Sequence, residues 1–174
     1  MEGKIDKGQV GFRRNHSTTD HLVTLRIITK EFHNNKSNLL CCFVDFIKAF
    51  DTVPRNNPWN RLEEIKVPFE LRVVAIRLYE EVIAMFNNNE GWTTDINCNI
   101  GVKQCFPLSP TLFGIYIDKL ERCLEDACST GTILARIVII LLLYGDDIVL
   151  MARCASHLDK QLRIIKDFCS NIDI

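Results

Sequence analysis

Apolar residues recur every three or four positions in several stretches of the chain, the spacing of one face of a helix. The predicted faces, in chain order, are Leu22, Leu25, Ile28 and Phe32; Leu71, Val74, Leu78, Val82 and Met85; Phe113, Ile117, Leu120 and Leu124; and Leu158, Leu162 and Ile165. Residues 17–20 suit the cap of the first helix, Ser109-Pro110 the start of the third, and Ser156 that of the last. The second helix is expected to end at residues 87–89, and the prolines before it predict a loop with a short helix.

Three other patterns predict strands. The run 39–46 is apolar except for Asp45, which is typical of a strand buried on both faces. Residues 96–102 alternate between apolar and polar, which indicates a half-buried strand. The runs 137–143 and 148–151 flank a turn sequence and predict a hairpin. Without a regular βαβ alternation the fold class is α+β, with helices packed on one face of a small, mostly antiparallel sheet.

Composition is ordinary for a globular domain. The 174 residues are 47% hydrophobic and 25% charged, which excludes a disordered or collagen-like chain. The net charge of −1 gives no bulk attraction to nucleic acid, although residues 1–40 hold seven basic and four acidic residues. The most apolar stretch, 137–143, is too short to span a bilayer, so no membrane association is expected.

The eight cysteines contain no CxxC pair and have no matching histidine cluster. They predict reduced, mostly buried thiols in an intracellular protein, with a structural zinc site as the alternative. The polar start of the chain lacks the apolar segment of a secretory signal.

Three aspartates interrupt or end apolar strands: Asp45, Asp146 and Asp147. Carboxylates near an apolar core are stable when they are paired, hydrogen-bonded or bound to a cation. Oxygen ligands alone select a hard ion such as Mg²⁺, and the chemistry that this indicates is two-metal phosphoryl transfer. The alternative is that the pair Asp146-Asp147 is only a turn and Asp45 only a strand end.

Four segments, in order, resemble the reverse transcriptases of non-LTR (LINE-type) retrotransposons, and the resemblance runs from about Gln9 to the last residue. The segments are GQVGFRRNHSTTDH at 8–21, FVDFIKAFDTV at 43–53, GVKQCFPLSPTLF at 101–113 and YGDDIVL at 144–150. They are similar to the family's fingers segment, first catalytic motif, template- and nucleotide-contacting motif, and catalytic hairpin.

The resemblance implies that the three aspartates are both the catalytic residues and the metal ligands. Asp45 and Asp146 would be the principal ligands of two Mg²⁺ ions, with Mn²⁺ as an alternative metal. Asp147 would be the third carboxylate, nearer the primer end. The metals would favour attack of the primer 3′-hydroxyl on the α-phosphate of a dNTP.

The same resemblance assigns contacts to the substrates. Residues expected to bind the nucleotide are Phe46, Phe50 and Gln104, with Phe50 under the sugar so that a 2′-hydroxyl would collide with its ring. The residues expected to contact template or primer are Arg13, Arg14, Tyr144 and Pro107. The alternatives are that Phe50 is a core residue and that Arg13 and Arg14 form a solvated basic pair.

Three positions depart from the family pattern. Cys105-Phe106 replaces the usual Gly-Cys, and a side chain at 105 is expected to obstruct the approach of backbone to nucleotide. Gly145 stands where these elements usually carry alanine, which is similar to the GDD motif of viral RNA-dependent RNA polymerases. Asn57-Pro58 brings a helix breaker just before Trp59.

The sequence is therefore interpreted as a partial reverse transcriptase domain over 1–174. Residues 1–40 are expected to be part of the fingers and 41–174 mostly palm, truncated before its end, with the thumb absent. The implied function is an RNA-directed DNA polymerase; the alternatives are a catalytically dead remnant that at most binds nucleic acid, and an RNA-dependent RNA polymerase. Implied partners are an RNA template, a DNA primer and dNTPs, without an obligate protein partner, in the nucleus or cytoplasm.

Overall fold

The centre of the fold is a three-stranded antiparallel sheet in the order β1-β9-β8. The computed structural model describes residues 11–12, 15–88, 91–127, 132–134 and 137–173. The strands are β1 (Leu40–Asp45), β8 (Leu141–Tyr144) and β9 (Asp147–Ala152). The predicted hairpin is confirmed, since β8 and β9 pair from Leu141–Leu150 to Tyr144–Asp147 across a two-residue turn.

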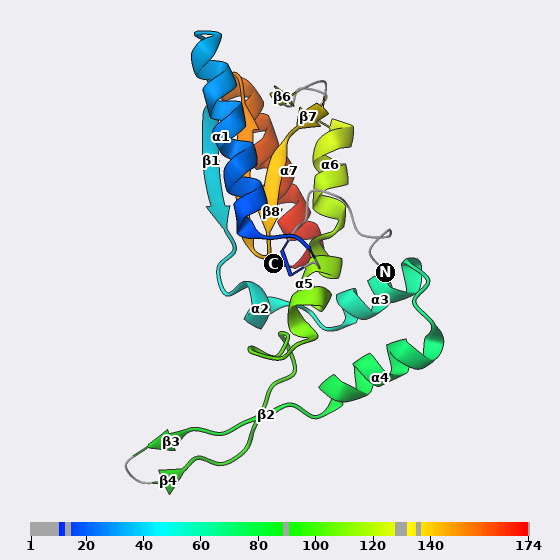
Figure 1. The fold of residues 1–174 in the computed structure, drawn as a ribbon. Helices are drawn as coiled ribbons and strands as arrows, with labels where there is room; N and C mark the ends of the chain where they lie inside the picture. The colour runs from blue at the N-terminus through cyan, green and yellow to red at the C-terminus, as the bar shows by residue number, and fades with distance from the viewer. Residues whose placement is uncertain (1–10, 13–14, 89–90, 128–131, 135–136, 174) are drawn as a thin grey trace.

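Helices cover both faces of this sheet, so the α+β class is confirmed but the expectation of one covered face is wrong (Figure 1). On one face α1 (Thr18–Asn34) brings Ile28 and Phe32 against Leu142 and Met151. On the other face α5 (Ser109–Ile117), α6 (Lys119–Ala127) and α7 (Ala155–Ile172) form the main core with alternate residues of the same strands. Because side chains alternate along a strand, both faces need apolar cover.

Strand β1 lies at the edge of the sheet and is not buried on both faces as its sequence predicts. Cys42 and Val44 pack against the main core, whereas Phe43 points to the other face and is 73% exposed. Helix α1 covers the central and far strands of that face but leaves Phe43 uncovered. A continuous apolar run therefore does not imply two-sided burial when the strand has only one neighbour.

Helix α1 begins where the sequence predicts. The Ser17 N–H donates to Asp20 Oδ2 over 2.8 Å, which satisfies a backbone donor at the helix start. Of the predicted apolar face, Ile28 and Phe32 are buried and Leu25 is packed against them. Leu22, in the first turns of the helix, is exposed.

Three helices follow β1: α2 (Ala49–Thr52), α3 (Asn56–Glu64) and α4 (Phe69–Glu80). Pro58 does not break a helix, because it lies in the first turn of α3, where no intrahelical N–H bond is lost. The prediction for α4 is wrong in both length and face. The helix ends at Glu80, and its predicted residues Leu71, Val74 and Leu78 are exposed while Ala75 and Tyr79 are buried.

After α4 the chain forms an arm that extends away from the sheet (Figure 1). It is held by two short antiparallel ladders, β2 (Ile83–Ala84) with β5 (Ile96–Asn97), and β3 (Asn87–Asn88) with β4 (Gly91–Trp92). Only the first two residues of the predicted strand 96–102 are in a strand. The rest of that segment bonds back to the body, where Gly101 N–H donates to Val53 O and Val102 N–H to Phe50 O.

Helices α5 and α6 carry the predicted apolar face into the core, and all four of its residues are buried. The predicted cap Ser109 is instead the first helical residue, after Leu108. Its buried hydroxyl bonds with Tyr79 Oη at 2.7 Å and donates to Lys103 O. The helix is interrupted at Asp118, whose nearly buried carboxylate accepts from Arg61 of α3.

The remaining elements also differ in detail from the predictions. The predicted strand 137–143 is divided at Ile140 into β7 (Ile137–Ile139), which pairs with β6 (Thr132–Leu134), and β8. Helix α7 is capped by Cys154 rather than Ser156. It buries Ile165 as predicted, together with Phe168 and Gln161, and the Gln161 amide donates to Met151 O.

The seven described cysteines are free thiols, as expected, but they are half-buried or exposed rather than buried. Cys128 lies outside the described residues. Within the described part of the chain, no helix combines the length and apolar character needed to cross a membrane.

Replacing Asp118 by alanine is expected to destabilise the fold by about 3–5 kcal/mol, because the largely buried Arg61 guanidinium loses its buried partner and keeps only the exposed carboxylate of Glu64. The matched control is Glu64→Ala, which removes the exposed partner of the same arginine and is expected to cost about 0–1 kcal/mol. Urea unfolding of both variants measures the difference, and equal losses would contradict a dominant role for Asp118.

Candidate active site

The three aspartates of the sequence prediction lie at one end of the sheet. Asp45 is the last residue of β1 and pairs directly with Asp147, the first residue of β9. Directly opposed residues of an antiparallel pair project to the same face, with Cβ atoms about 4.5–5.5 Å apart. Both side chains are exposed, and Asp146 lies beside them in the β8–β9 turn.

The turn that carries Asp146 depends on a glycine. Gly145 has φ of +63°, a left-handed conformation that residues with a Cβ adopt at a cost. Burial raises the pKa of the Asp146 carboxyl, the charges of Asp147 and Asp45 raise it further, and a backbone hydrogen bond opposes these effects. The ionised form of Asp146 is therefore disfavoured by its two neighbours, which is the condition that a bound cation would relieve.

The donor set of this sheet end fits a hard cation, since it consists of carboxylate oxygens. Across the described residues, however, no group of three or more His, Cys, Asp and Glu side chains is arranged as a metal cluster. Strand register and the hairpin turn bring the three aspartates to one end of the sheet against their mutual repulsion, and their carboxylates do not converge on one point.

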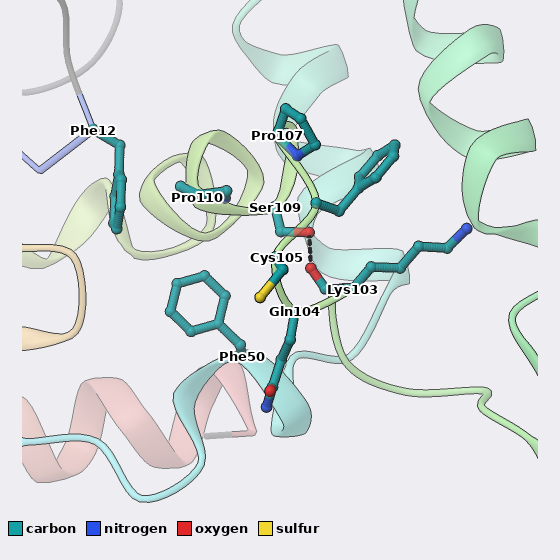
Figure 2. A pocket seen from close by; sticks show the side chains of 9 residues that line it. Phe12, Phe50, Lys103, Gln104, Cys105, Pro107, Ser109 and Pro110 are labelled. Atoms are coloured by element: carbon teal, nitrogen blue, oxygen red, sulfur yellow. Dashed lines mark hydrogen bonds between the residues drawn. The ribbon is translucent and has the colours of Figure 1, made fainter. Parts of the chain in front are cut away.

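A cavity of about 400 Å³ lies next to the N-terminal end of α5 (Figure 2). Its lining residues are Phe12, Phe50, Lys103, Gln104, Cys105, Phe106, Pro107, Ser109 and Pro110. The Phe50 ring is half-buried and stacks on Phe113 with centroids 4.9 Å apart. One face of Phe50 is thus fixed by the core, so the residue is both a core residue and part of the cavity wall.

Gln104 is tied to the segment that follows β1. Its amide donates to Asp51 Oδ1 over 2.8 Å, and both side chains are exposed. The next residue, Cys105, is exposed and has φ of +58°, the left-handed region that favours glycine. The glycine that the family usually carries at this position would suit this backbone conformation, whereas the obstruction of a nucleotide by the Cys105 side chain stays a prediction.

The other residues predicted to contact the nucleotide, template or primer differ in their exposure. Phe46 is buried, with its ring 6.3 Å from that of Phe113, so only its backbone is available to a ligand. Tyr144 is half-buried at the hairpin and pairs with Asp147, and Pro107 is exposed at the cavity rim. Arg13 and Arg14 lie outside the described residues.

Sequence reasoning missed Arg55, which joins the end of α4 to the segment around Gly101. Its guanidinium donates to Gly101 O over 2.9 Å and to Tyr79 O over 2.8 Å, and it lies 5.7 Å from the centre of the Tyr79 ring. Because these acceptors are backbone carbonyls, no complementary charge in the sequence indicates the role of Arg55. It also lines a second cavity, of about 1120 Å³, between the body and the arm.

Comparison with known proteins gives consistent matches. The family model described as "Reverse transcriptase (RNA-dependent DNA polymerase)" matches residues 2–174. The chain is 27% identical over 167 residues to a retrovirus-related Pol polyprotein from the type-1 retrotransposable element R2 of Nasonia vitripennis. It is 25% identical over 170 residues to that from the type-2 element R2DM of Drosophila melanogaster. The matches cover 94% and 97% of this chain but only 16% of each relative.

Two solved structures share the fold. Apo telomerase from Candida tropicalis, truncated from its C-terminal domain, has a TM-score of 0.59 at 19% identity, covering 92% of this chain and 32% of that one. Telomerase from Candida albicans, in complex with a fragment of telomeric RNA, has a TM-score of 0.64 at 13% identity, covering 87% and 28%. These likenesses show that the arrangement of sheet and helices is that of a polymerase fingers and palm.

Replacing Cys105 by glycine is expected to stabilise the fold by about 0.5–1 kcal/mol, because relief of the left-handed strain exceeds the entropy gained by the unfolded chain. The matched control is Cys41→Gly, another exposed cysteine but in strand β1, where glycine is expected to destabilise by about 0.5–1 kcal/mol. Thermal unfolding measures both, and a shift of the same sign in the two variants would contradict the strain at 105.

Replacing Gly101 by alanine is expected to destabilise the fold at the wall of the second cavity, since a Cβ there would lie 2.7 Å from Asp51 O. The control is Gly91→Ala, which also has a positive φ but has open space around the added carbon. Both variants incur backbone strain, so the clash alone accounts for an extra loss of about 1–3 kcal/mol at 101. Equal unfolding free energies for the two variants would show that the Asp51 backbone shifts at little cost to make room for the added Cβ.

Proposed function

The chain belongs to the reverse transcriptase (RNA-dependent DNA polymerase) family, which confirms the resemblance to non-LTR retrotransposon enzymes, and from this premise we propose a function for its aspartate end. We propose that these residues form the centre that adds deoxynucleotides to a primer on an RNA template. The chain spans 16% of the length of its R2 relatives, so it would supply part of the polymerase.

The observation that carries this proposal is the pairing of Asp45 with Asp147, with Asp146 in the adjacent turn. Three acidic side chains at one sheet end repel one another by roughly 1–4 kcal/mol per pair at 4 Å, depending on the effective dielectric constant. A turn or strand end that served only structure would gain nothing from this repulsion. The arrangement favours a function that recruits positive charge.

Divalent metal ions are a general property of the family, and we extend this to two Mg²⁺ ions held by Asp45 and Asp146, with Asp147 as the third carboxylate. When bound, Mg²⁺ supplies stabilisation of the charge that develops on the α-phosphate and the pyrophosphate. The carboxylates of the chain would fix the positions of the ions. Manganese has the same preference for oxygen ligands and is the alternative.

The neighbouring cavity is proposed as the nucleotide site. The Phe50 ring, held by its stacking on Phe113, is rigid enough to exclude a 2′-hydroxyl, which favours a DNA polymerase over an RNA polymerase. Gln104 would contact the nucleotide after exchanging its bond with Asp51. Pro107 and Tyr144 are proposed to contact the template or primer, together with Arg13 and Arg14.

The subdivision of the chain is also proposed from the family. Residues 1–40 would belong to the fingers and 41–174 mostly to the palm. Helix α1 of the proposed fingers part packs through Ile28 and Phe32 on the sheet of the proposed palm part. The two parts would therefore move together where α1 contacts the sheet. Copying of RNA by such a protein would take place inside the cell, in the nucleus or cytoplasm.

Primer extension tests the function directly. With an RNA template, a labelled DNA primer, dNTPs and Mg²⁺, the wild-type chain is expected to add nucleotides. Asp146→Asn is expected to reduce the rate by about 10²–10³-fold, because a group that stabilises the transition state is lost. Ribonucleotides offered in place of dNTPs are expected to be incorporated poorly, and efficient incorporation would favour the RNA polymerase alternative.

The control is Asp159→Asn, which changes an exposed aspartate of α7 that pairs with nearby Arg163 and lies outside the proposed site. This variant is expected to extend primers like the wild type. Melting curves with EDTA show whether Asp146→Asn is folded, and relief of carboxylate repulsion is expected to leave it at least as stable as the wild type. Equal extension by the wild type and Asp146→Asn, including none by either, would contradict the proposal and favour a catalytically dead remnant.

A further inference from the structure

Phe12 lies against the turn that carries the aspartates, although it is more than 130 residues earlier in the chain. Its ring centroid is 5.9 Å from that of Tyr144, and a Cβ added to Gly145 would be 3.1 Å from Phe12 Cε2. The residue nevertheless remains 55% exposed. One side of the ring therefore rests on the hairpin while much of it stays accessible.

The backbone at Phe12 is strained, with φ of +58°. A bulky residue in the left-handed region is uncommon and costs about 1–3 kcal/mol unless its surroundings hold it there. The aromatic contact with Tyr144 is weak by comparison, about 0.5–1.5 kcal/mol. Packing alone does not account for an exposed phenylalanine in this conformation.

The ring of Phe12 lines the 400 Å³ cavity that also contains Phe50 and Gln104, and the two rings enter it from different segments (Figure 2). The cavity falls in the size range of small-molecule sites, about 300–1,000 Å³. Phe50 has one face committed to Phe113, whereas Phe12 has an accessible face. An aromatic surface beside an amide is suited to a planar heterocycle.

We propose that Phe12 is a positioning residue that stacks on the base of the incoming nucleotide. This inference rests on the proposed function, since it assigns the base of the same substrate. Stacking of a base on an aromatic side chain contributes about 1–3 kcal/mol and tolerates every base, because each has a π-face. Phe12 would hold the base, while Phe50 limits the space for the sugar.

Titration with 2-aminopurine deoxyribonucleoside triphosphate in the presence of Mg²⁺ tests this role, because stacking on a ring quenches 2-aminopurine fluorescence. Phe12→Ala is expected to weaken binding about tenfold, which corresponds to about 1.4 kcal/mol, and to lose the quenching. Phe12→Tyr is expected to restore both. Phe12→Leu keeps an apolar side chain without a π-face and is expected to restore neither.

The matched control is Phe69→Ala, which removes a 66% exposed ring from α4, outside the cavity, and is expected to bind like the wild type. Absence of binding by the wild type would contradict the proposed function itself. Normal quenching and affinity in Phe12→Ala, with a functioning wild type, would overturn only the role of Phe12. Full rescue by Phe12→Leu would also overturn stacking, because it would reduce the role to filling space.

Discussion

The antiparallel pairing of β1 with β9 is the constraint on which the rest of the site depends. It sets Asp45 opposite Asp147, and the two-residue turn before β9 places Asp146 at the same end. A slip of one residue would move Asp45 to the other face of the sheet. The register is fixed by the residues of β9 that project to the opposite face of the sheet, where Ile148 and Leu150 are buried in the main core.

The apolar residues on the two faces of the sheet also offset the repulsion among the carboxylates at its end. Burial of a Leu or Ile side chain contributes about 1.5–3 kcal/mol, and β8 and β9 provide several such residues. Repulsion among carboxylates that are partly solvated is of similar or smaller size per pair. The sheet therefore tolerates an acidic end because its apolar residues lie on the strands and its charges lie where the strands stop. A cation would remove a penalty that the core already offsets.

The elements with strong local signals were predictable, and those that depend on tertiary partners were not. The capping sequence of α1, the glycine turn of the hairpin and the apolar face of α5 and α6 were confirmed because each is determined by nearby residues. The α4 prediction failed because its periodic leucines are exposed, while Tyr79 is drawn into the core by Trp59, Phe106 and Ser109. Burial of β1 was overestimated because sequence does not say which strand is at the edge. Arg55 was missed because its acceptors are backbone carbonyls, which every residue has, so the sequence does not indicate which of them it bonds.

Backbone strain in this fold lies in the segments that flank or connect the strands of the central sheet and not in those strands. Among the described residues, β1, β8 and β9 contain no positive φ, whereas Phe12 and Cys105 line the same cavity with φ near +58° and Gly145 forms the adjacent turn. A left-handed residue with a Cβ costs about 1–2 kcal/mol, so two at one cavity are a substantial fraction of the stability of a small domain. The unstrained sheet holds the aspartates, and the strained segments approach the space beside them. Rigid strands thus fix the proposed chemistry, while the residues that shape the proposed substrate pocket are held in conformations that only the surrounding fold maintains.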